Sequence, residues 1–147
     1  MASMPSERFR DNGDGTVTDS TSKLMWMRCS LGQRWQSGIC SGAAGELAWS
    51  QAQRHAEQLN RDGGAFYNDW RVPSLRELAT ITARECSAPR TNTAVFPGTA
   101  PAAYWSATQR PGQASTEQVF ALSFGAEGVF AAGKDARHHL RLVRTGP

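Results

Sequence analysis

Positively charged side chains gather in one segment near the C-terminal end of the sequence. Residues 134–144, KDARHHLRLVR, contain Lys134, Arg137, Arg141 and Arg144 against Asp135 alone. This segment accounts for the whole formal net charge of +3. Arginine, with its planar guanidinium, suits both buried ion pairs and the binding of sulfate or phosphate. The segment is therefore either a solvated strand face or an anion-binding site.

The anion-binding alternative defines a set of candidate ligand-binding residues. They are Lys134, Arg137, His138, His139 and Arg141. The two histidines, with an ordinary pKa near 6.5, would gain charge between about pH 7.5 and 5.5 and so strengthen binding on acidification. We expect Arg144 to lie apart from this face, turned inward to pair with an acid such as Asp69. Because no known nucleic-acid-binding motif accompanies the charge, we expect no nucleic-acid partner.

The stretch DNGDGTVTD, Asp11 to Asp19, could supply oxygen ligands for calcium. Aligning its Asp-Gly at 14–15 with that of an EF-hand loop places Arg10 at the first ligand position and Thr21 at the last, and neither is acidic. Asn-Gly and Asp-Gly instead favour a tight turn between strands. We predict a hairpin turn and a fold that needs no metal or cofactor, with a weak calcium site as the minor alternative.

The three cysteines suggest one disulfide. Cys29 and Cys40 bracket SLGQRWQSGI, a segment without helical or strand periodicity, which we interpret as a loop. A bond closing it would stabilise the fold by about 3 kcal/mol and would imply an oxidising compartment. Cys86 would then be free or buried. Metal binding by the cysteines is not expected, because no Cys-x-x-Cys pair is present.

A catalytic reading of the polar residues finds little support. In the triplet at 69–71, Asp69 and Arg71 flank Trp70, and alternation places both polar side chains on one side of an extended segment, where structural pairing explains them better than catalysis. His55 lies inside a predicted helix, and neither a Ser-x-Gly motif nor a local Cys-His pair accompanies the histidines. We expect no enzymatic activity.

Periodicity predicts the elements that position these residues. Strands are expected at ERFR, at TVTD and at KLMWMR, where alternation puts Leu24 and Trp26 on one face and Met25 and Met27 on the other. A helix is expected from Trp49 to about NRDGG, with Trp49, Ala52, Ala56 and Leu59 as its apolar stripe. A second helix starts at PSLRELATI, where Ser74 and Glu77 form a capping box.

The C-terminal half reads as a long loop followed by strands. Residues 86–103 form an ordered loop with Val95 and Phe96 tucked inward. Strands follow at AYWSAT, QVFALSF, VFAA and HLRLVR, with GAEG as a turn and with Phe120, Leu122 and Phe124 on one face. This order excludes a doubly wound parallel sheet and predicts an α+β domain.

Length and composition support a single globular domain over 8–147. At 147 residues the chain is about one domain long. No apolar run approaches the roughly 18 residues of a membrane span, so we expect no membrane insertion. Residues 1–7 carry no secretory signal and are expected to be a disordered domain edge.

Six fragments carry a family resemblance. They are DNGDGTVTDSTSKLMWMRCSLGQ, LAWSQAQRHAEQLN, DWRVPSLREL, FPG, YWSAT and the terminal LRLVR. In this order and spacing they resemble the Lcl C-terminal domain family, a bacterial family of unknown function, over about residues 8–144. Two positions depart from the family pattern: Val72 replaces a leucine, and Leu142 replaces the cysteine of some members, which leaves Cys86 without a mate.

The resemblance implies a variant of the C-type lectin fold, with antiparallel sheets, two helices, long loops and paired terminal strands. It also implies a secreted, cell-surface or periplasmic bacterial protein. The calcium-ligating clusters of sugar-binding C-type lectins are absent, so glycan binding here would not use that site. On this fold the residues expected to be structural are Trp26, Trp49, Asp69, Trp70, Arg71, Ser74, Glu77, Trp105 and Arg144.

Three classes of function follow from the resemblance and the charge. The favoured one is a non-catalytic adhesion module that binds sulfated or other anionic polysaccharide, because one member type of the family is associated with such ligands. The second is a tip or assembly domain of a pilus or phage-like fibre that binds a surface protein. The third is an enzyme on a fold like that of formylglycine-generating enzymes. A homotrimer would fit the resemblance and would multiply weak sites through avidity.

Overall fold

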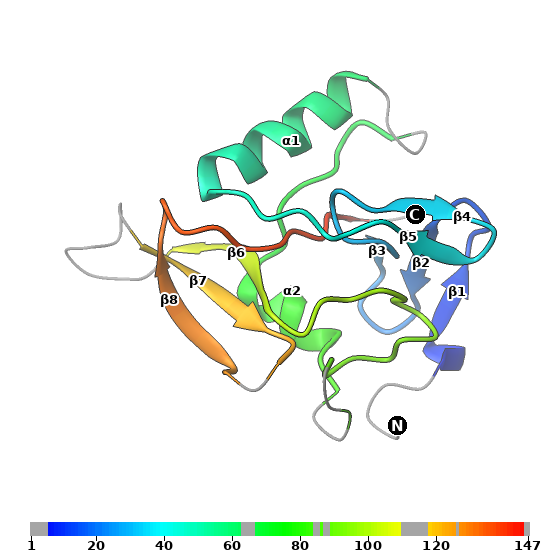
Figure 1. Cartoon of the computed structure of the whole chain (residues 1–147). Helices are drawn as coiled ribbons and strands as arrows, with labels where there is room; N and C mark the ends of the chain where they lie inside the picture. Colours follow the sequence, from blue (N-terminus) through cyan, green and yellow to red (C-terminus); the bar gives the residue numbers. More distant parts are fainter. Residues whose placement is uncertain are drawn as a thin grey trace.

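The fold combines two α-helices with three antiparallel sheets (Figure 1). The structure is a computed structural model that describes residues 6–62, 67–83, 86, 89–109, 118–125 and 127–145. Helices are few and the named strand pairs are all antiparallel, so the predicted α+β class is confirmed.

The largest sheet contains both ends of the described chain. Its order is β1 (Phe9–Asp11), β2 (Thr16–Asp19), β3 (Leu24–Met27) and β9 (Val143–Thr145). The first and last strands occupy opposite edges, so the prediction that the terminal strands pair with each other is wrong; β9 pairs with β3 instead. A 3-10 helix, η1 (Ser6–Arg8), precedes β1, so the predicted strand ERFR is regular only in its second half. Of the residues expected to be a disordered edge, 1–5 lie outside the described part.

The turn between β1 and β2 answers the question raised by the aspartates. The two strands form the predicted hairpin, with Asp11 paired to Val17. Asp11 Oδ1 accepts a hydrogen bond from Gly13 N at 2.9 Å, and Asp14 Oδ1 accepts from Thr16 N at 3.1 Å. Both carboxylates therefore order the turn itself. That the fold needs no calcium stays a prediction.

Both helices begin where the sequence predicts. Helix α1 (Trp49–Arg61) buries Trp49, Ala52 and Ala56. Helix α2 (Leu75–Thr80) has the complete capping box: Ser74 Oγ accepts from Glu77 N at 3.1 Å, and Glu77 Oε1 accepts from Ser74 N at 2.8 Å. Local spacing was sufficient for these elements because the signals lie within one helical turn.

The third sheet lies across the molecule from the first, with α2 between them (Figure 1). It consists of β6 (Ala103–Gln109), β7 (Gln118–Ser123) and β8 (Val129–Gly133), in that order. Within the loop that precedes β6, Val95 and Phe96 are buried as predicted. Part of the predicted GAEG turn, residue 126, lies outside the described residues.

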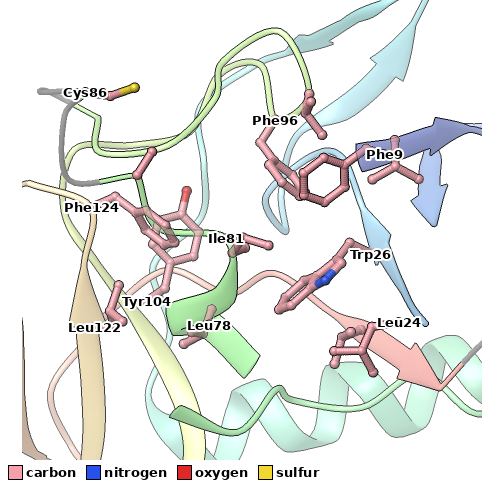
Figure 2. Close-up of a cluster of buried hydrophobic side chains, with 14 residues drawn as sticks. Phe9, Leu24, Trp26, Leu78, Ile81, Cys86, Phe96, Tyr104, Leu122 and Phe124 are labelled. Atoms are coloured by element: carbon pink, nitrogen blue, oxygen red, sulfur yellow. The ribbon is translucent and has the colours of Figure 1, made fainter. Parts of the chain in front are cut away.

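Aromatic side chains fill the space between α2 and the two sheets (Figure 2). Trp26 and Phe96 meet edge to face at 6.3 Å between ring centroids, and Phe9 meets Phe96 at 5.6 Å. Leu24 and Trp26 belong to this cluster, whereas Met25 belongs to a second cluster that includes the buried side of α1. The predicted alternation along β3 is thus confirmed, and each face of the strand meets its own core.

Two further strand predictions need correction. The segment between Cys29 and Cys40, expected to be a loop, contains β4 (Arg34–Gln36), which pairs with β5 (Ile39–Ser41). The final strand is shorter than HLRLVR: only Val143–Thr145 is regular, and residues 138 and 139 make isolated bridges. Strands of three residues are too short to show a period of two, and their pairing depends on distant partners.

Candidate functional site

The predicted ligand-binding residues lie along the connection from β8 to β9, which crosses the molecule between the two larger sheets (Figure 1). Lys134 and Arg137 stand at its start. The ammonium of Lys134 lies 4.6 Å from the centroid of the Trp49 ring, at the first residue of α1. Arg137 is exposed, and its Nη1 lies 3.5 Å from the carbonyl oxygen of Glu46. These two cations remain accessible to a ligand.

His138 is half-buried against aromatic rings. Its ring centroid lies 4.9 Å from that of Trp105 and 5.7 Å from that of Phe130. Burial lowers the pKa of His138, His139 lowers it further, and Glu46 opposes both. The pH range expected from an ordinary histidine therefore needs correction for this residue, because it gains charge at lower pH than 6.5.

His139 is buried rather than exposed. Its Nδ1 lies 2.9 Å from the carbonyl oxygen of Gly45, so Nδ1 carries the proton that this bond requires. Its Nε2 lies 3.9 Å from Oε2 of Glu46. These contacts tie the connection to residues 45–46 and leave little of His139 for a surface ligand.

Arg141 is a core residue, which corrects its placement on the predicted basic face. Its side chain is 1% exposed, because the guanidinium lies over Phe96 at 4.6 Å. Nη1 donates to the carbonyl oxygen of Arg28 at 2.7 Å, and Nη2 donates to Thr99 Oγ1 at 2.7 Å. No acidic residue of the described chain forms an ion pair with it. Burial lowers the pKa of Arg141, and Tyr104 opposes this.

Arg144 forms the predicted pair with Asp69. Its Nε donates to Asp69 Oδ1 at 2.6 Å, and its guanidinium carbon lies 3.8 Å from the centroid of the Tyr67 ring. Alternation had placed Arg71 on the same side as Asp69, but the two do not pair. Arg71 instead donates two hydrogen bonds of 2.7 Å to the carboxylate of Glu77. The carboxylate that caps α2 thus also holds the preceding segment.

The net charge is therefore not displayed where the sequence concentrates it. Of the four cations in residues 134–144, Arg141 and Arg144 are buried. The other residues expected to be structural include four tryptophans, and all four are buried: Trp26, Trp49, Trp70 and Trp105. The predicted face is reduced to Lys134, Arg137 and part of His138.

The predicted disulfide is confirmed, and it joins the β4–β5 hairpin to the residues that follow β3 of the first sheet. Cys29 and Cys40 are bonded, and Cys86 is free and buried. Gly15, in the first hairpin, has φ +91°, and a Cβ there would approach Trp35 Cγ to 2.9 Å. Only glycine allows this close approach between the two hairpins.

A cleft of about 350 Å³ was not anticipated from the sequence. It lies between α1 and residues 70–74, with Trp70 and Ala56 among its lining residues and Gln53, Glu57 and Asn60 on its helical wall. These three polar residues follow each other at spacings of four and three, so they form one row beside the apolar stripe. This row of polar residues is the sequence feature from which the cleft could have been predicted.

The described residues offer neither a metal cluster nor a membrane helix. Within the ranges that the structure describes, no group of three His, Cys, Asp or Glu side chains could hold a metal ion. No helix in those ranges is long and apolar enough to cross a membrane.

Comparison with known proteins agrees with the resemblance in the sequence. No curated protein matches this chain. The model of the Lcl C-terminal domain family matches residues 15–144, which include every strand from β2 to the first residues of β9 and both α-helices. The chain belongs to the Lcl C-terminal domain family.

Proposed function

We propose that this domain is a non-catalytic adhesion module that binds anionic polysaccharide weakly at the start of the β8–β9 connection. The observation that carries the proposal is the state of Lys134 and Arg137. Both are accessible, and neither forms an ion pair with any residue in the described ranges. The buried cations of the same segment already have partners inside the fold.

The start of α1 adds to this site. Trp49 N donates to the carbonyl oxygen of Lys134 at 3.1 Å, so the helix begins beside the lysine. The N-cap residue, Ala48, has no side-chain acceptor for the first-turn N–H groups. The positive end of the helix dipole therefore lies beside Lys134 and favours a sulfate or carboxylate there.

Two acids limit the strength of the interaction. Glu46 and Asp135 are exposed beside these cations, so the local charge is only weakly positive at neutral pH. We therefore expect low affinity per domain and strong weakening by salt. Useful adhesion would then require several domains in one assembly.

The proposal includes two inferences, one about the fold family and one about the cellular location of the protein. We infer a variant of the C-type lectin fold, supported by the α+β order and by a sheet that joins both chain ends. The Cys29–Cys40 bond supports an oxidising compartment and hence a secreted, surface-attached or periplasmic bacterial protein.

Heparin affinity tests the proposal. The double variant Lys134→Ala, Arg137→Ala should bind immobilised heparin about fivefold more weakly than wild type at low salt, since each exposed charge contributes up to about 1 kcal/mol. The matched control is Arg10→Ala, Arg76→Ala, which removes the same charge from exposed positions elsewhere. Equal losses in the two double variants would show that only net charge matters and would reject this site.

A protein-binding assembly domain is the second candidate, favoured by the β4–β5 hairpin. Ile39 is 58% exposed at the start of β5, one residue before the disulfide. A rigid hairpin with an exposed apolar tip suits contact with another protein surface. If it mediates assembly, sedimentation equilibrium should show oligomers of the wild type and monomers of Ile39→Asp. Monomeric wild type would count against this role.

A further inference from the structure

A second pocket, of about 380 Å³, lies between the end of α2 and the β7–β8 hairpin. Its size is within the usual range for small-ligand sites. Its lining includes Thr82 from just after the end of α2, Arg90 from the loop that follows, and Leu122, Ser123 and Val129 from the β7–β8 hairpin. It is far along the chain from the cations discussed above, and its chemistry is different.

Arg90 is the distinctive residue of this pocket. Its backbone is held on both sides: Arg90 N donates to Phe124 O at 2.7 Å, and Arg90 O accepts from Ala83 N at 2.7 Å. Its side chain is half-buried, yet the guanidinium makes neither a hydrogen bond nor an ion pair with any residue of the described ranges. A guanidinium in a partly desolvated wall gains most from a carboxylate, which it can bind through two parallel hydrogen bonds.

The β7–β8 side of the pocket restricts what else the ligand can be. Ser123 Oγ donates to Glu127 Oε1 at 2.6 Å, and this bond lowers the pKa of Glu127 and keeps it ionised. Glu127 does not itself line the pocket, but its carboxylate is bonded to the lining residue Ser123, so it would repel a second negative charge placed near Ser123. Leu122 and Val129 offer apolar contact, and Val129 is 51% exposed at the rim. The pocket therefore suits one negative charge joined to an apolar group and disfavours a polyanion.

We propose that this pocket binds a monocarboxylate with an apolar side chain, anchored by Arg90. The ligand is either a free small molecule or the C-terminal residue of a polypeptide, since both present the same chemistry. The site is independent of polysaccharide binding at Lys134 and Arg137, so either proposal can fail without the other.

The test uses N-acetyl-L-leucine as the probe and N-acetyl-L-leucinamide as its uncharged match. Titration followed by two-dimensional amide NMR should shift the amides of Ala79, Thr82 and Val129 with the acid and leave them unchanged with the amide. Arg90→Gln should weaken binding of the acid roughly tenfold to a hundredfold, as expected for loss of a charged hydrogen-bonding partner. Arg76→Gln, an exposed arginine on α2, is the control and should bind as wild type.

Two further comparisons complete the design. Ala79→Phe keeps Arg90 but fills the pocket from the exposed side of α2, and it should abolish the shifts. The peptide acetyl-Gly-Gly-Leu with a free C-terminus separates the two sources: binding equal to that of the acid indicates a polypeptide end, and exclusion indicates a free molecule. Equal shifts with acid and amide, unchanged binding by Arg90→Gln in a folded protein, or no shift in wild type would each overturn the proposal.

Discussion

Residues 134–145, which comprise the β8–β9 connection and β9 itself, divide into two halves that carry the same kinds of residue but differ in burial. In the outer half, residues 134–138, Arg137 is exposed and Lys134 is half-buried over the Trp49 ring. Neither has an acidic partner among the described residues. In the inner half, residues 139–145, Arg141 and Arg144 are enclosed by rings and hydrogen-bonded. The difference shows that a basic segment is not necessarily a basic surface.

The two arginines of the inner half are buried against different kinds of partner. Arg144 meets a carboxylate, whose side chain is 53% exposed, at the edge of the first sheet. Arg141 meets only neutral acceptors, and in the described chain its Nε has no hydrogen-bond partner. A buried charge without a counter-ion is costly, so the stacking on Phe96 and Tyr104 must supply part of the compensation.

Arg141 should give the largest effect on stability. Arg141→Ala removes a buried side chain, leaves a cavity and leaves the acceptors of Arg28 and Thr99 unpaired, so the free energy of unfolding should fall by about 3 kcal/mol or more. Arg141→Met retains volume and should lose less. Urea denaturation measures both, with Arg137→Ala as the exposed control expected to stay within about 0.5 kcal/mol of wild type. A loss below about 1 kcal/mol for Arg141→Ala would erase the distinction between the halves.

Asp69→Asn should have a smaller effect, about 1 kcal/mol at neutral pH, because solvent screens the half-exposed carboxylate. The bond to Arg144 lowers the pKa of Asp69. Its stabilisation is therefore complete above the ordinary pKa of 3.8 and is lost as the pH falls through the lower folded-state pKa. The gap in urea midpoint between wild type and Asp69→Asn should shrink in acid, whereas Asp135→Asn should show no such gap. A gap that persists in acid would contradict this origin.

The outer half should contribute little to stability. Lys134→Ala, Arg137→Ala should lower the free energy of unfolding by only about 1 kcal/mol, the contribution of a half-buried cation over an aromatic ring plus that of an exposed arginine. Thermal and urea unfolding of the double variant check this. A larger loss would mean that Lys134 stabilises the start of α1, and a change in heparin affinity could not then be assigned to lost contacts.

His138, at the boundary between the halves, should give the smallest effect. Its pKa lies below 6.5 because of burial and of His139, so polysaccharide affinity should rise only when the pH falls below that value. The same depression means that folding stability from His138 is complete above 6.5 and declines in acid. An NMR titration of its ring protons, alongside heparin retention across pH, tests both. A midpoint at or above 6.5 would show that the ring is solvated.

Features carried by neighbouring residues were predicted well. The stripe of α1, the Ser74–Glu77 box, the two-faced β3 and the turn after Asp11 depend on spacings of two to four residues. Even the pair between Arg144 and Asp69 could be proposed, because the terminal segment LRLVR was expected to turn that arginine inward. Short-range periodicity reflects helix and strand geometry, which each segment carries whatever the rest of the chain does.

Other features were decided only when distant segments met. Alternation with Leu140 and Leu142 would place Arg141 on the exposed face, together with the predicted basic residues. Its burial comes instead from contacts with Arg28 and Thr99, which are 113 and 42 residues away. The β4–β5 hairpin, the edge position of β9 and the pocket beside Arg90 have the same origin. A charge pattern in the sequence specifies how strongly a side chain can interact. Packing decides whether its partner belongs to the core or to a ligand, because burial is a property of the assembled elements and not of the segment.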